Sequence, residues 1–214
     1  TYVIASDGDM MEGVSHEACA LAGHLALGKL TVLYDDNGIS IDGPTALAFS
    51  EDVLGRFAAY GWHTQRVDGH DHDAVEAALR AAQAEIARPS LIACKTHIGF
   101  GSPNRQDSNK AHGEPLGADE VRLTKERLGW PPDAQFYVPD AARDFVREAS
   151  ASGAAQQAEW DTLFARYAQA YPEQAAEFLS ALRGELPPLP WDSQLPTFAL
   201  DKAMATRAAS GMVL

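Results

Sequence analysis

The chain is short of positive charge. It has 17 Lys and Arg residues against 30 Asp and Glu residues, which gives a formal net charge of −13 and a pI near 4.8. Nucleic-acid-binding proteins need a basic face, and anionic membrane surfaces attract basic segments. The composition therefore argues against both nucleic acid and membrane as partners. An anionic small molecule would have to bind through a metal ion or a local group of basic residues.

Cysteine and long hydrophobic runs are also scarce. Only Cys19 and Cys94 are present, each among apolar neighbours, and both are expected to be reduced thiols of the core. This pattern favours a cytoplasmic location, where disulfides are rare. No apolar stretch approaches the roughly 20 residues of a membrane-spanning helix, and no signal peptide is visible.

The 214 residues suffice for one large domain or one and a half, and the 46% hydrophobic content is typical of a globular protein. The first residues already form an apolar run, and the last ten, ATRAASGMVL, resemble the start of an amphipathic helix. Natural termini rarely lie inside hydrophobic elements. We therefore expect a fragment of a longer protein.

The first half of the chain alternates between short apolar runs and segments with helical periodicity. Strands are expected over 2–5, 30–35, 63–67 and 90–95, and helices over 12–27, from Ser50 to about Tyr60, and after an N-cap at Asp71. Gly61 is expected to end the second helix. Alternating strands and helices predict an α/β fold: a parallel sheet with helices on both faces.

The second half is predicted to be mainly helical. A long polar loop over 96–117 precedes a helix over 118–128. An aromatic stripe at Trp160, Phe164, Tyr167 and Tyr171 indicates later helices, and these rings are expected to pack in the core or between domains. Pro172 is expected to restart a helix. We place domain boundaries so that 1–135 is the α/β domain, 136–184 its helical extension, 185–197 a Pro-rich linker, and 198–214 the start of a truncated second domain.

Two oxygen-bearing side chains follow two consecutive predicted strands. Asp7 comes after the first strand, and Asn37 comes 30 positions later, after the second. The carboxyl ends of parallel strands meet at one edge of a sheet, where ligands bind. Mg2+ prefers such oxygen ligands and shares them with substrate phosphates, so we predict a magnesium site with the Ile39 carbonyl as third ligand. Gly8 would let the backbone approach a diphosphate. The alternative is that Asp7 and Asn37 are only a helix cap and a turn residue.

A second group of metal-binding residue types occurs in DGHDHD, which contains His70, Asp71, His72 and Asp73. The same run is typical of a strand-to-helix turn with Asp71 as the N-cap. We adopt the turn interpretation.

Several segments resemble the cofactor domain of one enzyme family. They are DGDMMEGVSHEACALAGHLALGKL, YDDNGISIDG, FAAYGWH, KTHIGFGSPN, HGEPLG and LGW. In this order and spacing they resemble the thiamine-diphosphate-binding domain of transketolases, over essentially the whole chain. The resemblance implies the thiamine-diphosphate-binding fold, with 1–135 as the diphosphate-binding domain and 198–214 as the start of the pyrimidine-binding domain. It also implies a homodimer that transfers a two-carbon ketol unit between sugar phosphates.

The resemblance assigns roles to particular residues. Asp7, Asn37 and the carbonyl of Ile39 match the Mg2+ ligands, an ion that Ca2+ or Mn2+ can replace, and Gly8 matches the glycine at the diphosphate. Three further residues match family positions: His112 lies between diphosphate and substrate, Arg207 binds the sugar phosphate, and Glu12 is a buried glutamate near the dimer interface. Other catalytic groups of the family lie outside this stretch, so the fragment alone is expected to be inactive.

Two positions depart from the family. Ser6 replaces the first glycine of Gly-Asp-Gly, and a positive φ there would cost about 1 kcal/mol. Asp9 replaces an uncharged residue, and its charge would weaken cofactor binding if it pointed at the diphosphate.

Other functions remain open. Dihydroxyacetone synthase and deoxyxylulose-phosphate synthase use the same cofactor, and a non-catalytic, cofactor-binding half subunit would also retain these motifs. A generic nucleotide-binding domain fits less well, because neither Gly-x-Gly-x-x-Gly nor a P-loop lysine is present.

Overall fold

The computed structural model describes residues 1–186, 191–199 and 203–214. The chain divides into two compact units, Thr1–Tyr137 and Val138–Leu214. The first contains the α/β part and the second the helical part. The Pro-rich linker at 185–197 and the second-domain start at 198–214 lie partly outside the described residues, and their boundaries stay predictions.

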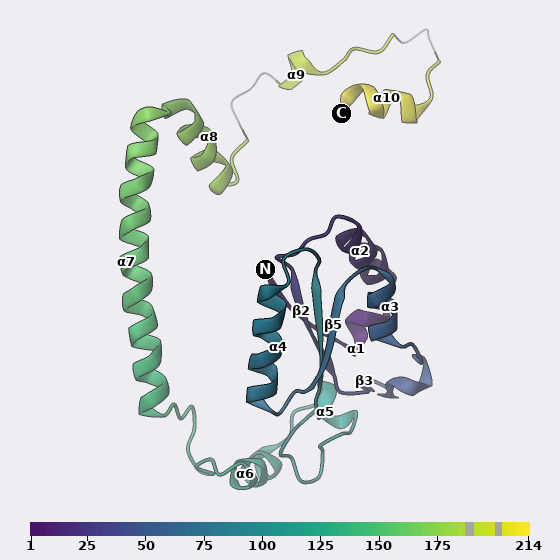
Figure 1. Ribbon diagram of the computed structural model, residues 1–214, viewed down its shortest axis with the longest axis vertical. Helices are drawn as coiled ribbons and strands as arrows, with labels where there is room; N and C mark the ends of the chain where they lie inside the picture. Colours follow the sequence, from purple (N-terminus) through teal and green to yellow (C-terminus); the bar gives the residue numbers. More distant parts are fainter. Residues whose placement is uncertain (187–190, 200–202) are drawn as a thin grey trace. The chain divides into compact units, whose positions relative to one another are not determined.

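The first unit is built on a four-stranded parallel sheet with the order β1-β2-β6-β5 (Figure 1). The strands are β1 (Tyr2–Ser6), β2 (Thr31–Asp36), β5 (His63–Asp68) and β6 (Ser90–Lys95). A short antiparallel pair, β3 (Ile39–Ser40) and β4 (Gly43–Pro44), follows β2 at the carboxyl edge, and η1 (Thr45–Leu47) continues it. All four predicted strands are therefore confirmed.

Helices cover both faces of this sheet, as predicted. They are α1 (Asp7–Met11), α2 (Gly13–His24), α3 (Val53–Ala59) and α4 (His72–Ala84). In β2, Val32 and Tyr34 pack with Met10 and Phe57 on one face, whereas Leu33 packs with α4 on the other. This alternation follows from the two-residue period of a strand.

Strand position explains the different hydrophobicity of the strands. β6 is central, and its first five residues, Ser90 to Cys94, are buried, which is typical of a parallel strand covered on both faces. β1 lies at the edge of the sheet, and its Ile4 is 82% exposed. The first unit therefore leaves apolar surface open beside β1.

Capping residues fix the helix boundaries. The Asp71 carboxylate accepts hydrogen bonds from the N–H groups of Asp73 and Ala74 at 3.0 and 3.1 Å, which confirms the predicted cap of α4. Gly61, with φ of +85°, follows the end of α3 as expected. The prediction of Ser50 as the N-cap of α3 was wrong, because Asp52 caps it by accepting from the Gly55 N–H at 3.0 Å.

The segment after β1 differs from the expected turn. Helix α1 begins directly at Asp7, and Glu12 then joins it to α2, which ends at His24 instead of Leu27. Carboxylates in the first turn of a helix interact favourably with its dipole, and Asp7 and Asp9 both lie there. Asp7 is therefore held on a helix and not in a flexible loop.

The loop over 96–117 contains the short helix α5 (Lys110–Gly113), and the predicted helix after it is α6 (Ala118–Arg127). Figure 1 shows α5, α6 and β3 at the same end of the sheet. This is the carboxyl edge, because β2 and β6 both end there.

The second unit contains the long helix α7 (Asp140–Ala170), α8 (Pro172–Leu182), α9 (Trp191–Gln194) and α10 (Thr206–Val213). Pro172 begins α8 as predicted. The aromatic stripe packs within this unit: the ring of Phe164 lies 5.1 Å from that of Trp160 and 5.6 Å from that of Phe178. Among the described residues, no helix is long and apolar enough to cross a membrane.

Candidate cofactor site

The Asp7 carboxylate is the centre of the candidate site. It is 2% exposed and accepts three hydrogen bonds. The Tyr34 hydroxyl donates to Oδ1 at 2.6 Å, and the backbone N–H groups of Asn37 and Gly38 donate to Oδ2 at 3.2 and 2.9 Å. A buried carboxylate requires such partners, since an unpaired one is costly. The tips of β1 and β2 are thereby joined.

Asn37 and Ile39 lie directly beside this carboxylate. The Asn37 side-chain oxygen accepts from the Ile39 N–H at 2.9 Å, which fixes the orientation of its amide. Ile39 is paired with Pro44, which has no N–H to donate to the Ile39 carbonyl. The three predicted metal ligands are therefore neighbours, and each offers an oxygen atom.

The residues present fit a divalent cation carrying a diphosphate. The donors are one carboxylate, one amide oxygen and one carbonyl, which are the oxygen ligands that Mg2+ accepts. A Cβ added at Gly8 would meet no atom within 4 Å, so the backbone beside Asp7 faces open space. A larger group could approach the chain there.

Tyr34 was missed by the sequence reasoning. It is 4% exposed and belongs to β2, three positions before Asn37. Burial and the hydrogen bond to Asp7 raise the pKa of Tyr34. The signal that would have found it is a tyrosine directly after the apolar pair Val32 and Leu33, because a buried tyrosine hydroxyl usually has a partner.

Ser6 and Asp9, the two positions that depart from the family pattern, contact each other. Ser6 has φ of −113°, an extended conformation without strain. The Asp9 carboxylate accepts from the Ser6 N–H at 2.8 Å and from the Ser6 hydroxyl at 3.0 Å. Ser6 therefore does not have the positive φ that would cost energy, and the Asp9 carboxylate is turned back to the start of α1.

His112 lies apart from these contacts. It is an exposed residue of α5, and its backbone N–H donates to the Asn109 carbonyl at 3.0 Å. No hydrogen bond of its side chain is found within the described residues. Its predicted place between diphosphate and substrate therefore stays a prediction.

A buried carboxylate anchors the loop that carries His112. Glu120, 8% exposed on α6, accepts from the Ser102 hydroxyl and from the backbone and side-chain N–H groups of Asn104 at 2.9 and 2.8 Å. These donors, the Asn104 amide first, lower the pKa of Glu120. No sequence signal separated Glu120 from an ordinary acidic residue in the first turn of a helix.

Glu12 and Arg207 are both exposed. Glu12 is the joint between α1 and α2, and its carbonyl accepts from the Ser15 hydroxyl at 2.8 Å. The family resemblance implies a buried glutamate here, and burial would require a partner surface. Arg207 is the second residue of α10 in the second unit.

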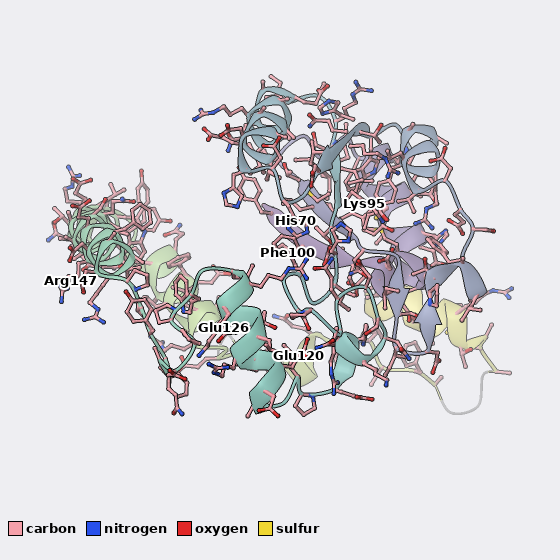
Figure 2. The ribbon with its side chains drawn as sticks, turned by 90° about the horizontal axis from the view of Figure 1, so that it is seen from below. His70, Lys95, Phe100, Glu120, Glu126 and Arg147 are labelled. Carbon is pink, nitrogen blue, oxygen red and sulfur yellow. The ribbon has the colours of Figure 1, made fainter. Side chains whose placement is uncertain are left out.

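The His70 run forms part of a ring stack at the carboxyl edge. The His70 ring lies 4.0 Å from that of Phe100 and 5.7 Å from that of His97. His70 Nε2 also accepts from the His97 backbone N–H at 3.1 Å. Figure 2 shows His70, Phe100 and Lys95 gathered beside the ends of β5 and β6. These contacts link the two βα loops.

Comparisons with known proteins identify this α/β unit as a thiamine-diphosphate-binding domain. The family model described as "Transketolase, thiamine diphosphate binding domain" matches residues 1–187. The chain belongs to the transketolase family.

Individual relatives support this assignment. The chain is 48% identical to a transketolase of Halalkalibacterium halodurans over its whole length, and 54% identical over 87% of its length to transketolase 1 of Vibrio cholerae. It spans 32% and 28% of these two relatives.

Solved structures show the same correspondence. Transketolase from Pichia stipitis, described as a complex with sedoheptulose 7-phosphate, matches the whole chain with a TM-score of 0.84 and 44% identity. Transketolase from Leishmania mexicana matches it with a TM-score of 0.85 and 41% identity. The chain spans 32% of each. These matches confirm the predicted α/β fold.

Proposed function

We propose that the full-length protein is a transketolase that requires Mg2+ and thiamine diphosphate. It transfers a two-carbon ketol unit from a ketose phosphate to an aldose phosphate, so the donor leaves two carbons shorter and the acceptor two carbons longer. The observation that carries the proposal is the junction of Asp7 with Asn37 and Gly38 at neighbouring strand tips. It supplies oxygen ligands at the edge where open α/β sheets bind ligands.

Different residues of the chain would bind the metal ion, the diphosphate and the substrate. Asp7, Asn37 and the Ile39 carbonyl would hold the Mg2+ ion, with Ca2+ or Mn2+ as replacements, and Gly8 would leave room for the diphosphate. The bound cofactor supplies the electron sink for breaking the carbon–carbon bond. His112 would donate a hydrogen bond or positive charge near the diphosphate and the substrate, and Arg207 would bind the sugar phosphate.

Sugar phosphates are the proposed substrates. Pichia stipitis structures are described as complexes with sedoheptulose 7-phosphate and fructose 6-phosphate. The acidic composition of this chain does not oppose this, because a metal ion and local basic groups can bind an anion.

A homodimer is proposed with α2 in the interface. Val14, Leu21 and Leu25 lie at helical spacing on or just after α2 and are 70%, 56% and 56% exposed. Exposed apolar stripes of this kind mark interaction sites. Glu12 precedes the stripe, and a second subunit there would bury it. Leu21→Glu is expected to shift the full-length protein toward monomer in sedimentation.

A cytoplasmic location in the pentose phosphate pathway is also proposed. Cys19 and Cys94 are free thiols that pack on opposite faces of the sheet, and burial raises the pKa of both. Unpaired core cysteines suit a reducing compartment.

The activity is tested with the full-length protein, Mg2+, thiamine diphosphate, sedoheptulose 7-phosphate and an aldose phosphate. Mass spectrometry should find a new ketose phosphate two carbons longer than the acceptor. Cofactor binding without any product would favour the non-catalytic half subunit. Product only with a different acceptor class would favour dihydroxyacetone synthase, and product only with a 2-oxo acid as donor would favour deoxyxylulose-phosphate synthase.

A further inference from the structure

We propose that Tyr34 is a positioning residue of the metal site, whose hydroxyl holds Asp7 so that one lone pair of Oδ1 faces the divalent cation. This inference rests on the proposed function, because it assigns a role at the same site. Tyr34 itself would not touch the metal, the cofactor or the substrate.

The hydrogen bonds of Asp7 determine which oxygen remains available. A carboxylate has about four lone-pair sites. The two backbone N–H groups of Asn37 and Gly38 occupy Oδ2, and the Tyr34 hydroxyl occupies one site on Oδ1. The remaining site lies on Oδ1. Asp7 would therefore hold the cation through Oδ1, the oxygen to which Tyr34 donates.

Tyr34 is the side chain that this arrangement depends on. Within the described residues, the other donors to Asp7 are backbone groups. Tyr34 is 4% and Asp7 2% exposed, and their oxygens are 2.6 Å apart, a short distance typical of a hydrogen bond to a charged acceptor.

The charges around Asp7 give Tyr34 a second effect. Asp7 and Tyr34 line a polar cavity of about 150 Å³ together with Asp36, Glu51, Asp52, Thr45, Phe49, Val53 and Arg66. Four carboxylates thus share the cavity with one cation, and Arg66 is already bonded to Asp36 at 2.9 Å. Without the hydroxyl, Oδ1 of Asp7 would have no side-chain donor among the described residues and would face like charges.

The test is Tyr34→Phe in the full-length protein. Titration calorimetry at saturating thiamine diphosphate measures the Kd for Mg2+. We expect this Kd to rise about tenfold or more, the usual effect of removing a partner of a metal ligand. Raising the Mg2+ concentration should restore the affinity of the variant for thiamine diphosphate, because the defect would lie in holding the metal.

The matched control is Tyr60→Phe. Tyr60 packs against Phe57 in the same core, and no hydrogen bond of its hydroxyl is found in the described part of the chain. Its Mg2+ affinity should equal that of the wild type. Equal Mg2+ affinities for Tyr34→Phe and Tyr60→Phe would overturn the inference. A wild-type protein that binds no Mg2+ with thiamine diphosphate would instead overturn the proposed function.

The ratio of the Kd values for Mg2+ and Ca2+ distinguishes a positioning role of Tyr34 from a general loss of stability. Mg2+ demands nearly ideal octahedral geometry, whereas Ca2+ accepts mono- or bidentate carboxylates. A loosened Asp7 should therefore weaken Mg2+ more than Ca2+, so the ratio of the two Kd values should rise in Tyr34→Phe. A variant that is merely less stable would weaken both ions by the same factor, and this result would also contradict the inference.

Discussion

Asp7 and His112 are candidate site residues at the same edge of the sheet, but they differ in burial and in how the fold fixes their positions. Asp7 is buried, begins a helix, and is fixed by the next strand through Tyr34, Asn37 and Gly38. His112 is exposed on a four-residue helix, and its loop is anchored at Glu120. The proposed metal cradle of Asp7, Asn37 and Ile39 is therefore preorganised within this chain, whereas the position of His112 depends on the anchoring of its loop by Glu120.

The largest effect is expected from removing the centre of the cradle. Asp7→Ala in the full-length protein should abolish Mg2+-dependent binding of thiamine diphosphate, because the diphosphate loses the charged ligand of its metal. Calorimetry checks this. Asp68→Ala is the control, since Asp68 also ends a strand, but among the described residues its carboxylate accepts only from the nearby His70 N–H. Unchanged cofactor affinity in Asp7→Ala would remove the site.

His112→Ala tests the proposed role of the exposed His112 side chain in turnover. It should lower kcat about a hundredfold, the size found when one donor to a reacting oxygen is lost, with a much smaller change in cofactor affinity. Steady-state kinetics at saturating cofactor measure this. His72→Ala, at an exposed position that begins α4, is the control. Wild-type turnover in His112→Ala would exclude His112 from the mechanism.

Glu120→Gln should loosen the loop without touching the cradle. Turnover should fall while the Kd for Mg2+ stays unchanged, because the Ser102 and Asn104 donors lose a charged acceptor. Glu126→Gln is the control: Glu126 lies on the same helix in an exposed ion pair with Arg122 (Figure 2). A weakened Mg2+ site in Glu120→Gln would show that the two regions are not independent.

The effect of Glu120→Gln on the free energy of unfolding should depend on pH. The pKa of Glu120 is lowered in the folded protein, so its stabilising effect is complete above the unfolded value of about 4.3 and is lost as the pH falls through the folded value. Urea unfolding should therefore show the largest difference between wild type and Glu120→Gln near neutral pH. A difference that grows toward acid pH would contradict the assigned hydrogen bonds.

The smallest effect concerns Ser6 and Asp9. Asp9→Asn should lower the free energy of unfolding by about 1 kcal/mol, as for the loss of a helix cap, and barely change the affinity for thiamine diphosphate. Ser6→Gly combined with Asp9→Asn should be less destabilising than the sum of the two changes. A clear gain in cofactor affinity for Asp9→Asn would mean that the Asp9 charge acts on the diphosphate.

The sequence predicted the parts that depend on regular periodicity. The four strands, the Asp71 cap and the meeting of Asp7 with Asn37 follow from apolar runs and from the rule that parallel strands end at one edge. Helix α1 was not predicted, because five residues cannot display a helical period. Tyr34 and Glu120 were missed because their roles depend on partners 27 and 16 or more positions away, which no local pattern reports.

The central claim is that the tips of β1 and β2 hold the metal of a cofactor diphosphate. The most direct measurement is anomalous diffraction from crystals of the full-length protein grown with thiamine diphosphate and Mn2+ in place of Mg2+. A peak about 2.1 Å from Asp7 Oδ1, the Asn37 amide oxygen and the Ile39 carbonyl is the expected result. A metal bound elsewhere, with thiamine diphosphate present, would contradict the account.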